Sequence, residues 1–293
     1  MKIWLMAARP RTLPAAIAPV LVGTAAAVEE TDDLRVWAFV AALIGSVFIQ
    51  IGTNLANDYS DAKRGADSVD RLGPVRVTAA GLVTPRRVLT ATWIAFAVAV
   101  ATGVYLATVA GPVILIVGVA SILAGVLYTG GPRPYGYAGL GELFVFLFFG
   151  LVAVNGSYYV QVERLDWLAF ALSISVGLLA TAILVVNNLR DIDTDRRVGK
   201  RTLAVRLRRA RTRAFYALLL AGAYVALLVG IPAAGGPAWA LLALLSLPLA
   251  RPPLTAVRTR SDGPGLNAAL AQTGMLLATF SALLAGGLLL ALA

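Results

Sequence analysis

The chain has 293 residues, of which 59% are hydrophobic and 14% are charged, and its formal net charge is +10. A soluble domain carries about 25% charged residues, so this composition argues against a soluble protein. The sequence contains no cysteine and no histidine, which excludes disulfides, thiolate nucleophiles, Cys/His metal sites and histidine bases. Any chemistry must use Asp, Glu, Asn, Tyr, Lys or Arg side chains, or a metal ion bound by oxygen.

Long apolar runs, separated by short charged clusters, predict helices that cross a membrane, because a spanning helix needs ~20 apolar residues. Their Gly, Ala, Val and Leu content favours helices over the short alternating strands of an outer-membrane barrel. The first run is interpreted as a spanning helix and not as a cleavable signal peptide. In chain order the predicted segments are about 13–27, 36–57, 87–108, 112–128, 139–160, 166–189, 214–231, 236–250 and 266–291. The expected fold class is an all-α polytopic membrane protein, with one integral-membrane domain over 1–293.

The basic residues predict how the chain is oriented in the cell membrane. With the N-terminus inside, all but two of the 25 Lys and Arg residues lie on the cytoplasmic side, and only Arg35 and Arg164 lie outside. The outer side also holds the acidic loop 29–33. This asymmetry predicts a cytoplasmic N-terminus and cytoplasmic long loops. The positive charge is explained by topology and contact with anionic membrane lipid, so nucleic acid is not an expected partner.

Two of the interior loops share a pattern of amides, carboxylates, basic residues and a glycine. The first runs from Asn54 to Asp67 and the second from Asn187 to Lys200. They emerge from predicted helices at the same membrane face and, with Asp70, contain seven of the 15 acidic residues. The repetition favours one shared site over two ordinary solvated loops.

Within each loop, an asparagine and two aspartates recur at helical spacing, which places them on one helix face. They are Asn54, Asp58 and Asp61 in the first loop and Asn187, Asp191 and Asp195 in the second. Asp193 is expected to point away. Carboxylates one turn apart repel each other unless a cation lies between them, and Mg²⁺ prefers one or two carboxylates together with phosphate oxygens of a substrate. Basic side chains are expected to complement a diphosphate; they are Lys63, Arg64, Arg190, Arg196 and Lys200.

A site at the membrane face suits a prenyl diphosphate, whose tail can lie between helices while its diphosphate reaches a polar mouth. A metal ion neutralises the departing diphosphate and lowers the barrier to allylic C–O cleavage. Aromatic side chains can shield the allylic cation, but lipid contact is the favoured interpretation of Phe144, Phe146, Phe148 and Phe149. Glu142, near a predicted helix start, is explained by the positive end of the helix dipole.

At these residues the chain resembles the UbiA superfamily of intramembrane prenyltransferases, and within it the branch that prenylates 1,4-dihydroxy-2-naphthoate. The two aspartate motifs carry the likeness to the superfamily. The opening stretch from Ala8 to Val20 and the Tyr/Gly/Pro stretch from Tyr128 to Tyr137 carry the likeness to the branch, and the segments 70–76 and 199–207 extend it over nearly the whole chain.

The resemblance implies about nine helices around a central cavity that opens to the cytoplasm and to lipid. It also implies transfer of a polyprenyl group from polyprenyl diphosphate to 1,4-dihydroxy-2-naphthoate, with loss of CO₂ and diphosphate, giving demethylmenaquinone. The implied catalytic residues are Asp58, Asp61, Asp191 and Asp195, which with Asn54 are also the implied Mg²⁺ ligands.

Contacts with the prenyl diphosphate or with the aromatic substrate are expected at four further residues. The resemblance implies that Tyr128 and Arg133 contact the diphosphate. Arg9 and Arg11 could bind the naphthoate carboxylate or the diphosphate, with positive-inside anchoring an equal alternative. One departure from the family pattern is Arg208, where the family usually has glycine, interpreted as a local change at a helix start.

Two other functions fit part of the pattern. A UbiA-type enzyme with another acceptor, such as 4-hydroxybenzoate, haem or a glycerol phosphate, would carry the same aspartate motifs. A transporter for an anionic substrate could use the carboxylates as an ion site, but an alternating-access transporter places its site near the bilayer midplane, whereas both motifs lie at one face.

Overall fold

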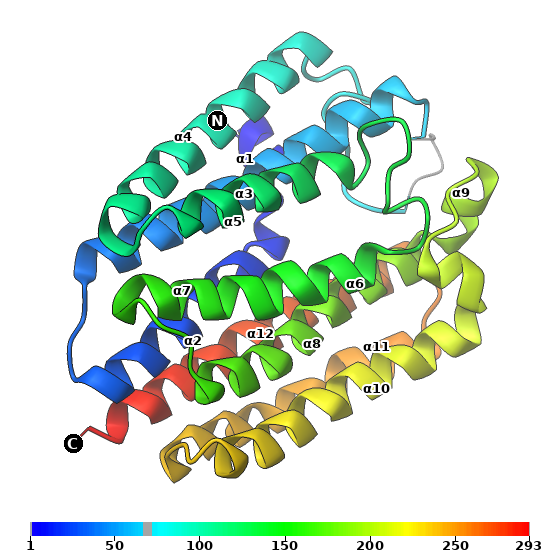
Figure 1. Ribbon diagram of the computed structural model, residues 1–293. Coiled ribbons are helices and arrows are strands. Elements are labelled where there is room, and N and C mark those ends of the chain that lie inside the picture. The colour runs from blue at the N-terminus through cyan, green and yellow to red at the C-terminus, as the bar shows by residue number, and fades with distance from the viewer. Residues whose placement is uncertain (1, 67–71, 293) are drawn as a thin grey trace.

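The computed structural model describes residues 2–66 and 72–292, and its regular elements in these ranges are all helical (Figure 1). The predicted all-α class is therefore confirmed. The elements are α1 Lys2–Ala8, η1 Pro10–Thr12, α2 Pro14–Thr31, α3 Val36–Lys63, α4 Pro85–Ala110, α5 Val113–Leu127, α6 Gly141–Val145, η2 Phe146–Val152, α7 Ala153–Val162, α8 Trp167–Arg190, α9 Ile192–Arg197, α10 Leu203–Ala233, η3 Ala238–Ala250, α11 Arg251–Thr259 and α12 Gly263–Leu290. Asp67 and Asp70 of the first acidic loop lie outside the described residues.

Each of the nine predicted apolar segments coincides with a helix or a continuous run of helices. Within the described chain, seven helical segments are long and apolar enough to cross a membrane, and a bent pair, Ile3–Thr12 with Pro14–Thr31, makes up to eight. The two parts of that pair turn by 52° at their junction. α5 is apolar but has only 15 residues. The chain is an integral membrane protein, and nine spans is an approximate count.

Both aspartate motifs lie at one end of the bundle. α3 and α8 finish there, beside α9 and the loops that follow α3 and α5 (Figure 1). At the opposite end, Arg35 donates a 2.8 Å hydrogen bond to Glu163, and Arg164 pairs with Glu30. The segments that the charge distribution assigned to opposite membrane faces are therefore at opposite ends of the molecule.

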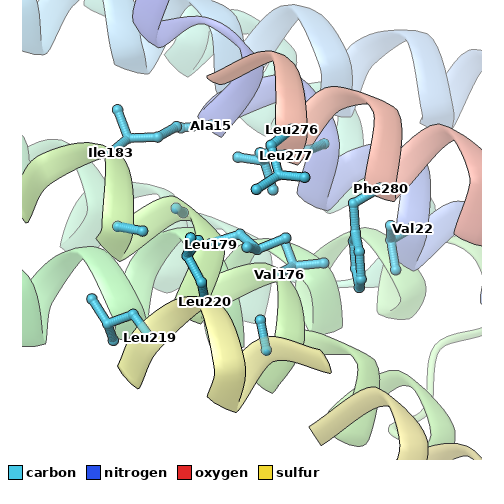
Figure 2. Close-up of a cluster of buried hydrophobic side chains, with 14 of the residues drawn as sticks. Ala15, Val22, Val176, Leu179, Ile183, Leu219, Leu220, Leu276, Leu277 and Phe280 are labelled. Atoms are coloured by element: carbon cyan, nitrogen blue, oxygen red, sulfur yellow. The ribbon is translucent and has the colours of Figure 1, made fainter. Parts of the chain in front are cut away.

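The core is built around α8, the most buried of the candidate spans, with 72% of its apolar window inside the protein. Figure 2 shows Val176, Leu179 and Ile183 of α8 in one cluster with side chains of α2, α10 and α12. Small residues let spanning helices approach closely: a Cβ on Gly150 of η2 would lie 2.6 Å from the Cα of Gly177 in α8. This packing holds the second aspartate motif, at the end of α8, against the rest of the bundle.

α10 contains one break in its helical geometry, at Arg208, where φ is 64° and ψ is 165°. This region of backbone space is populated almost entirely by glycine. Arg208 lies at a kink between a short first helical segment of α10 and the longer one that follows, so it stands at a helix start, as expected. The position has a backbone conformation suited to glycine but carries a long side chain.

Candidate active site

A cavity of about 330 Å³ connects the two aspartate motifs to the apolar interior. Asp61 of α3, Asp191 at the end of α8 and Asp195 of α9 line its polar end, and Leu106 of α4 and Ile114 of α5 line its apolar end. The predicted central cavity is thus present, and the two motifs face a common space.

Asp58 departs from the prediction that it lines this space. It is 2% exposed, and its two carboxylate oxygens accept the backbone N–H groups of Val77 and Thr78 at 3.0 Å each. Its neighbour Asn57 faces the cavity instead. Successive helical residues differ in direction by about 100°, so facing Asn57 inward turns Asp58 toward the loop. Asp58 therefore holds the loop after α3 in place.

Asp61 lies where three segments meet. It is 1% exposed and accepts hydrogen bonds from Arg76 at 3.1 Å, Lys200 at 3.0 Å and the Tyr137 hydroxyl at 2.7 Å. The Lys200 ammonium also lies 4.7 Å from the centre of the Tyr137 ring. Asp61 thus holds two cationic side chains, from two different loops, at this end of the cavity. Arg76 and Tyr137 were not among the predicted site residues, although both belong to stretches that carry the family likeness.

The turn after α9 brings Lys200 back to the cavity. Gly199 has a φ of 76°, a value that glycine adopts without the steric cost of a Cβ. The N–H of Lys200 then donates to the carbonyl oxygen of Asp195 at 2.9 Å. This local geometry explains why a glycine and a lysine follow the second aspartate motif.

The second motif lines the cavity with Asn187, Asp191 and Asp195, the three residues predicted to share a face. Arg190, predicted to bind substrate, is 1% exposed and does not line the cavity. Its guanidinium donates to Asp191 at 2.6 and 2.8 Å, to Asn187 at 2.8 Å and to Asn267 of α12 at 2.7 Å. Because it is surrounded by these acceptors, Arg190 orients the motif and does not face a ligand.

The other predicted polar residues divide between cavity and solvent. Arg9 lines the cavity, whereas Asp193 points away, as expected, and pairs with Arg209 at 2.9 Å. Five residues predicted to bind substrate are instead solvent-exposed and outside the cavity lining, because the helix end or loop that carries each one turns it outward: Arg11, Lys63, Arg64, Arg133 and Arg196.

Asn54 links the cavity to the N-terminal segment. Its side-chain nitrogen donates to the carbonyl oxygen of Ala8 at 3.0 Å and to the hydroxyl of Thr12 at 3.2 Å. Gln50, one turn earlier on α3, donates to the same hydroxyl at 3.1 Å. Gln50 and Thr12 also line the cavity and were missed; the spacing of Gln50 and Asn54, four residues apart on one helix, was the available signal.

An aromatic wall lines one side of the cavity. The rings of Tyr135 and Phe144 are stacked with centroids 3.9 Å apart, and Phe148 continues the stack at 6.1 Å from Phe144. Tyr128 lies 5.5 Å from Tyr135. Burial raises the pKa of Tyr135, in the loop after α5, above the usual value for tyrosine, so its hydroxyl stays protonated.

The lipid-contact interpretation of the phenylalanines is wrong for three of the four. Phe144, Phe148 and Phe149 line the cavity, and only Phe146 is outside the lining, packed against Gly177. The helix is π-helical over Phe146–Val152, and such wider turns are frequent at functional sites. Which face a side chain occupies can be predicted from sequence only where the helical repeat is regular, and a π-helical segment does not follow that repeat.

The oxygen donors around the polar end suit a hard cation such as Mg²⁺. Asp61, Asp191, Asp195 and Asn54 all line one cavity. In the described ranges, however, no three or more acidic side chains are grouped closely enough to hold a metal ion by themselves. Mg²⁺ is typically bound by one or two carboxylates plus phosphate oxygens, so these residues fit an ion that is shared with a bound diphosphate.

Comparisons with known proteins agree over nearly the whole chain. Residues 16–262 match the model of the UbiA prenyltransferase family. The chain is 46% identical over 285 residues to the 1,4-dihydroxy-2-naphthoate octaprenyltransferase of Mycobacterium tuberculosis, covering 97% of this chain and 96% of that protein. It is 42% identical to the enzyme of the same name from Escherichia coli, covering 84% and 82%.

Solved structures match the fold at low sequence identity. A UbiA homolog from Archaeoglobus fulgidus aligns with a TM-score of 0.70 at 15% identity, covering 98% of this chain and 99% of that one. The structure of that homolog bound to GPP and Mg²⁺ aligns with a TM-score of 0.61 at 14% identity, covering 96% and 99%.

Proposed function

The chain belongs to the UbiA prenyltransferase family, and on that basis we propose that it transfers a polyprenyl group from polyprenyl diphosphate to 1,4-dihydroxy-2-naphthoate. The reaction releases CO₂ and diphosphate and gives demethylmenaquinol, the reduced form of demethylmenaquinone, because the ring keeps both hydroxyl groups. The acceptor is proposed from the relatives that are 42–46% identical and carry this activity in their names.

The observation that carries the proposal is the division of one cavity into a charged end and an apolar end. The charged end has Lys200 and Arg76 on one carboxylate, while the other end is lined by residues of α3, α4 and α5 as far as Ala42. Asp61 and Ala42 lie on α3, ~28 Å apart at 1.5 Å per residue. This shape and polarity match a diphosphate with a long hydrocarbon tail, and they do not match a small soluble anion.

We assign the donor site to residues that line the polar end. Lys200 and Arg76 bind the diphosphate oxygens, and Asp61, Asp191, Asp195 and Asn54 would hold Mg²⁺ beside them. Mg²⁺ bound there supplies charge neutralisation for the departing diphosphate. Asp58 contributes by fixing the loop that carries Arg76.

The chemistry then requires an electrophilic prenyl carbon next to an electron-rich ring. The ring carbon that bears the carboxylate bonds to C1 of the prenyl group as the C1–O bond breaks and diphosphate leaves. The bond between that ring carbon and the carboxylate then breaks, CO₂ departs, and the electron pair returns to the ring. The faces of Tyr135, Phe144 and Phe148 stabilise positive charge on the prenyl group and exclude water while it is exposed.

We further propose that the chain forms one domain over 1–293 in the cell membrane, with the polar end of the cavity at the cytoplasmic face. The support is the distribution of basic residues, of which only Arg35 and Arg164 are assigned to the outer side. Cysteines introduced at exposed Arg133 and Leu165 of the cysteine-free chain test this orientation. In intact cells, an impermeant thiol reagent is expected to label the cysteine at position 165 alone.

The activity is tested with purified protein, a polyprenyl diphosphate and a panel of aromatic acceptors, with products identified by mass. Prenylated, decarboxylated product is expected from 1,4-dihydroxy-2-naphthoate, and a chelator is expected to stop the reaction until Mg²⁺ is restored. Turnover of 4-hydroxybenzoate without turnover of dihydroxynaphthoate would overturn the acceptor assignment.

A further inference from the structure

A buried carboxylate beside the cavity has no role in the donor site. Glu142, in the first turn of α6, is 4% exposed. One of its oxygens accepts a 2.9 Å hydrogen bond from the side-chain nitrogen of Asn188, and its other oxygen is buried without a hydrogen-bond partner. A carboxylate in an apolar span is costly and is a candidate for function. A favourable helix dipole alone does not explain why its partner comes from α8.

The partner, Asn188, lines the cavity. The side-chain nitrogen of Asn188 donates the hydrogen bond, so the nitrogen end of the amide faces Glu142. The amide oxygen is then left for the cavity, where it can accept a hydrogen bond from a ligand. Glu142 thus determines which end of the Asn188 amide a ligand meets.

The position of Asn188 relates it to the donor site. It precedes Asp191 by three residues on the same helical path, which places it ~4.5 Å further from the polar mouth along the axis of α8. A group bound to Asn188 therefore lies beyond the diphosphate, at the depth where the first prenyl carbons follow the phosphate oxygens.

The surroundings of Glu142 favour a flat ring. The Tyr128 side chain lies against Gly141, the residue before Glu142, at 3.1 Å from an added Cβ. Two residues further along the chain, Phe144 is stacked on Tyr135 at 3.9 Å. A hydrogen-bond acceptor beside an aromatic wall is complementary to a planar aromatic molecule that carries a hydroxyl group.

We propose that the amide oxygen of Asn188, oriented by Glu142, accepts a hydrogen bond from a ring hydroxyl of the aromatic acceptor. The ring lies against the aromatic wall, next to the first carbons of the prenyl donor. This inference rests on the proposed prenyl transfer to a dihydroxynaphthoate. Asn188 is a substrate-binding residue, and Glu142 is a positioning residue that acts through it.

The first experiment measures the effect of a substitution on the KM of the aromatic acceptor separately from its effect on the KM of the prenyl donor. Asn188→Leu is expected to raise the KM for 1,4-dihydroxy-2-naphthoate about tenfold, the effect of one lost hydrogen bond, and to leave the KM for prenyl diphosphate unchanged. Asn155→Leu is the matched control, because the Asn155 amide bonds to Leu151 of the preceding η2 and lies outside the cavity lining. An unchanged acceptor KM in folded Asn188→Leu protein overturns the proposal.

Acceptor analogues identify the hydroxyl and need no variant that might fail to fold. Wild-type protein is expected to bind one of the two monohydroxy-2-naphthoates, the one that lacks the bonded hydroxyl, about tenfold more weakly than the dihydroxy compound. That analogue should also be insensitive to Asn188→Leu. Equal binding of both analogues and the dihydroxy compound overturns the proposal.

Glu142 is tested by two substitutions with opposite expectations. Glu142→Gln keeps a carbonyl oxygen facing Asn188 and should retain nearly wild-type kinetics. Glu142→Leu should raise the acceptor KM as Asn188→Leu does, and the double variant should be no worse than either single variant, because residues that act as one unit are not additive. Loss of turnover with every acceptor in Glu142→Gln would contradict a positioning role.

Failure of this inference is distinguishable from failure of the proposed function. If wild-type protein prenylates none of the naphthoates, the proposed function fails. If it prenylates them and Asn188→Leu and Glu142→Leu both show wild-type acceptor KM values, the proposed function stands and the acceptor contact is wrong.

Discussion

The Nζ atom of Lys200 lies 3.0 Å from the Oδ2 atom of Asp61, although 139 residues separate them in the chain. Arg76 donates to the same oxygen at 3.1 Å. The three side chains are each at most 8% exposed, and charges in such surroundings require partners. Asp61 therefore joins the loops after α3 and α9 at the polar end of the cavity.

Lys200→Met is expected to raise the KM for prenyl diphosphate at least about tenfold, because a charged hydrogen bond to the diphosphate is lost. The protein should remain folded, since Arg76 and Tyr137 still bond Asp61. Steady-state kinetics in detergent measure the effect, with the exposed Arg201→Met as control. A donor KM equal to that of wild type would exclude Lys200 as a diphosphate ligand.

Asp58→Asn and Asp195→Asn are expected to affect different properties, protein stability in the first and Mg²⁺ dependence in the second. Asp58→Asn leaves one of the two backbone N–H groups that bond to Asp58 without an acceptor, which should reduce stability by ~1–3 kcal/mol. Asp195→Asn should raise the Mg²⁺ concentration for half-maximal activity at least about tenfold, because a carboxylate ligand is lost. Thermal unfolding and Mg²⁺ titration separate the two; an unchanged unfolding temperature in Asp58→Asn would contradict its structural role.

Phe148→Leu is expected to increase the fraction of donor that is hydrolysed to prenyl alcohol, because a ring that shields the allylic cation from water is removed. Phe146→Leu is the matched control, since Phe146 lies in the same π-helical segment but packs on Gly177 outside the cavity lining. Product and alcohol are quantified together by mass. Equal partitioning in both variants would show that the wall does not protect the cation.

Gly118→Leu is expected to disfavour long prenyl donors. Gly118 of α5 lines the apolar end of the cavity, and a Cβ there meets no atom within 4 Å, so a leucine side chain would occupy the space for the tail. The ratio of kcat/KM for a short donor to that for a long donor should rise at least about tenfold. Each CH₂ group of the tail that can no longer be buried reduces the binding free energy by ~0.8 kcal/mol. Gly286→Leu, also in open space but outside the lining, should leave this ratio unchanged.

Arg208→Gly is expected to stabilise the protein by about 1 kcal/mol. A non-glycine residue at φ 64° and ψ 165° stores ~1–3 kcal/mol of strain, and the added freedom of glycine in the unfolded chain offsets about 0.4–1 kcal/mol of the gain. The unfolding temperature in detergent should increase. A decrease would mean that contacts of the Arg208 side chain outweigh the strain.

Much of the fold and the location of the site followed from the sequence alone. A helix that crosses a membrane needs a long apolar run in the sequence, so each span can be predicted from its own residues. Carboxylates are easily recognised between such runs. The clusters around Asp61 and Asp191 were therefore found, and the stretches near Arg9 and Tyr128 indicated the family.

Only the tertiary structure decided which side chains face the cavity. Asp58 turns toward the backbone of a loop, and Arg190 is enclosed by acceptors from two helices, although each stands within an aspartate motif. Arg76 contacts Asp61 and Asn188 lines the cavity, and no local pattern predicted either placement. The physical reason is that facing a cavity depends on the rotation of each helix about its axis, which is set by packing against segments far away in the chain. The contact between Lys200 and Asp61 depends on this long-range packing and could not be predicted from either segment alone.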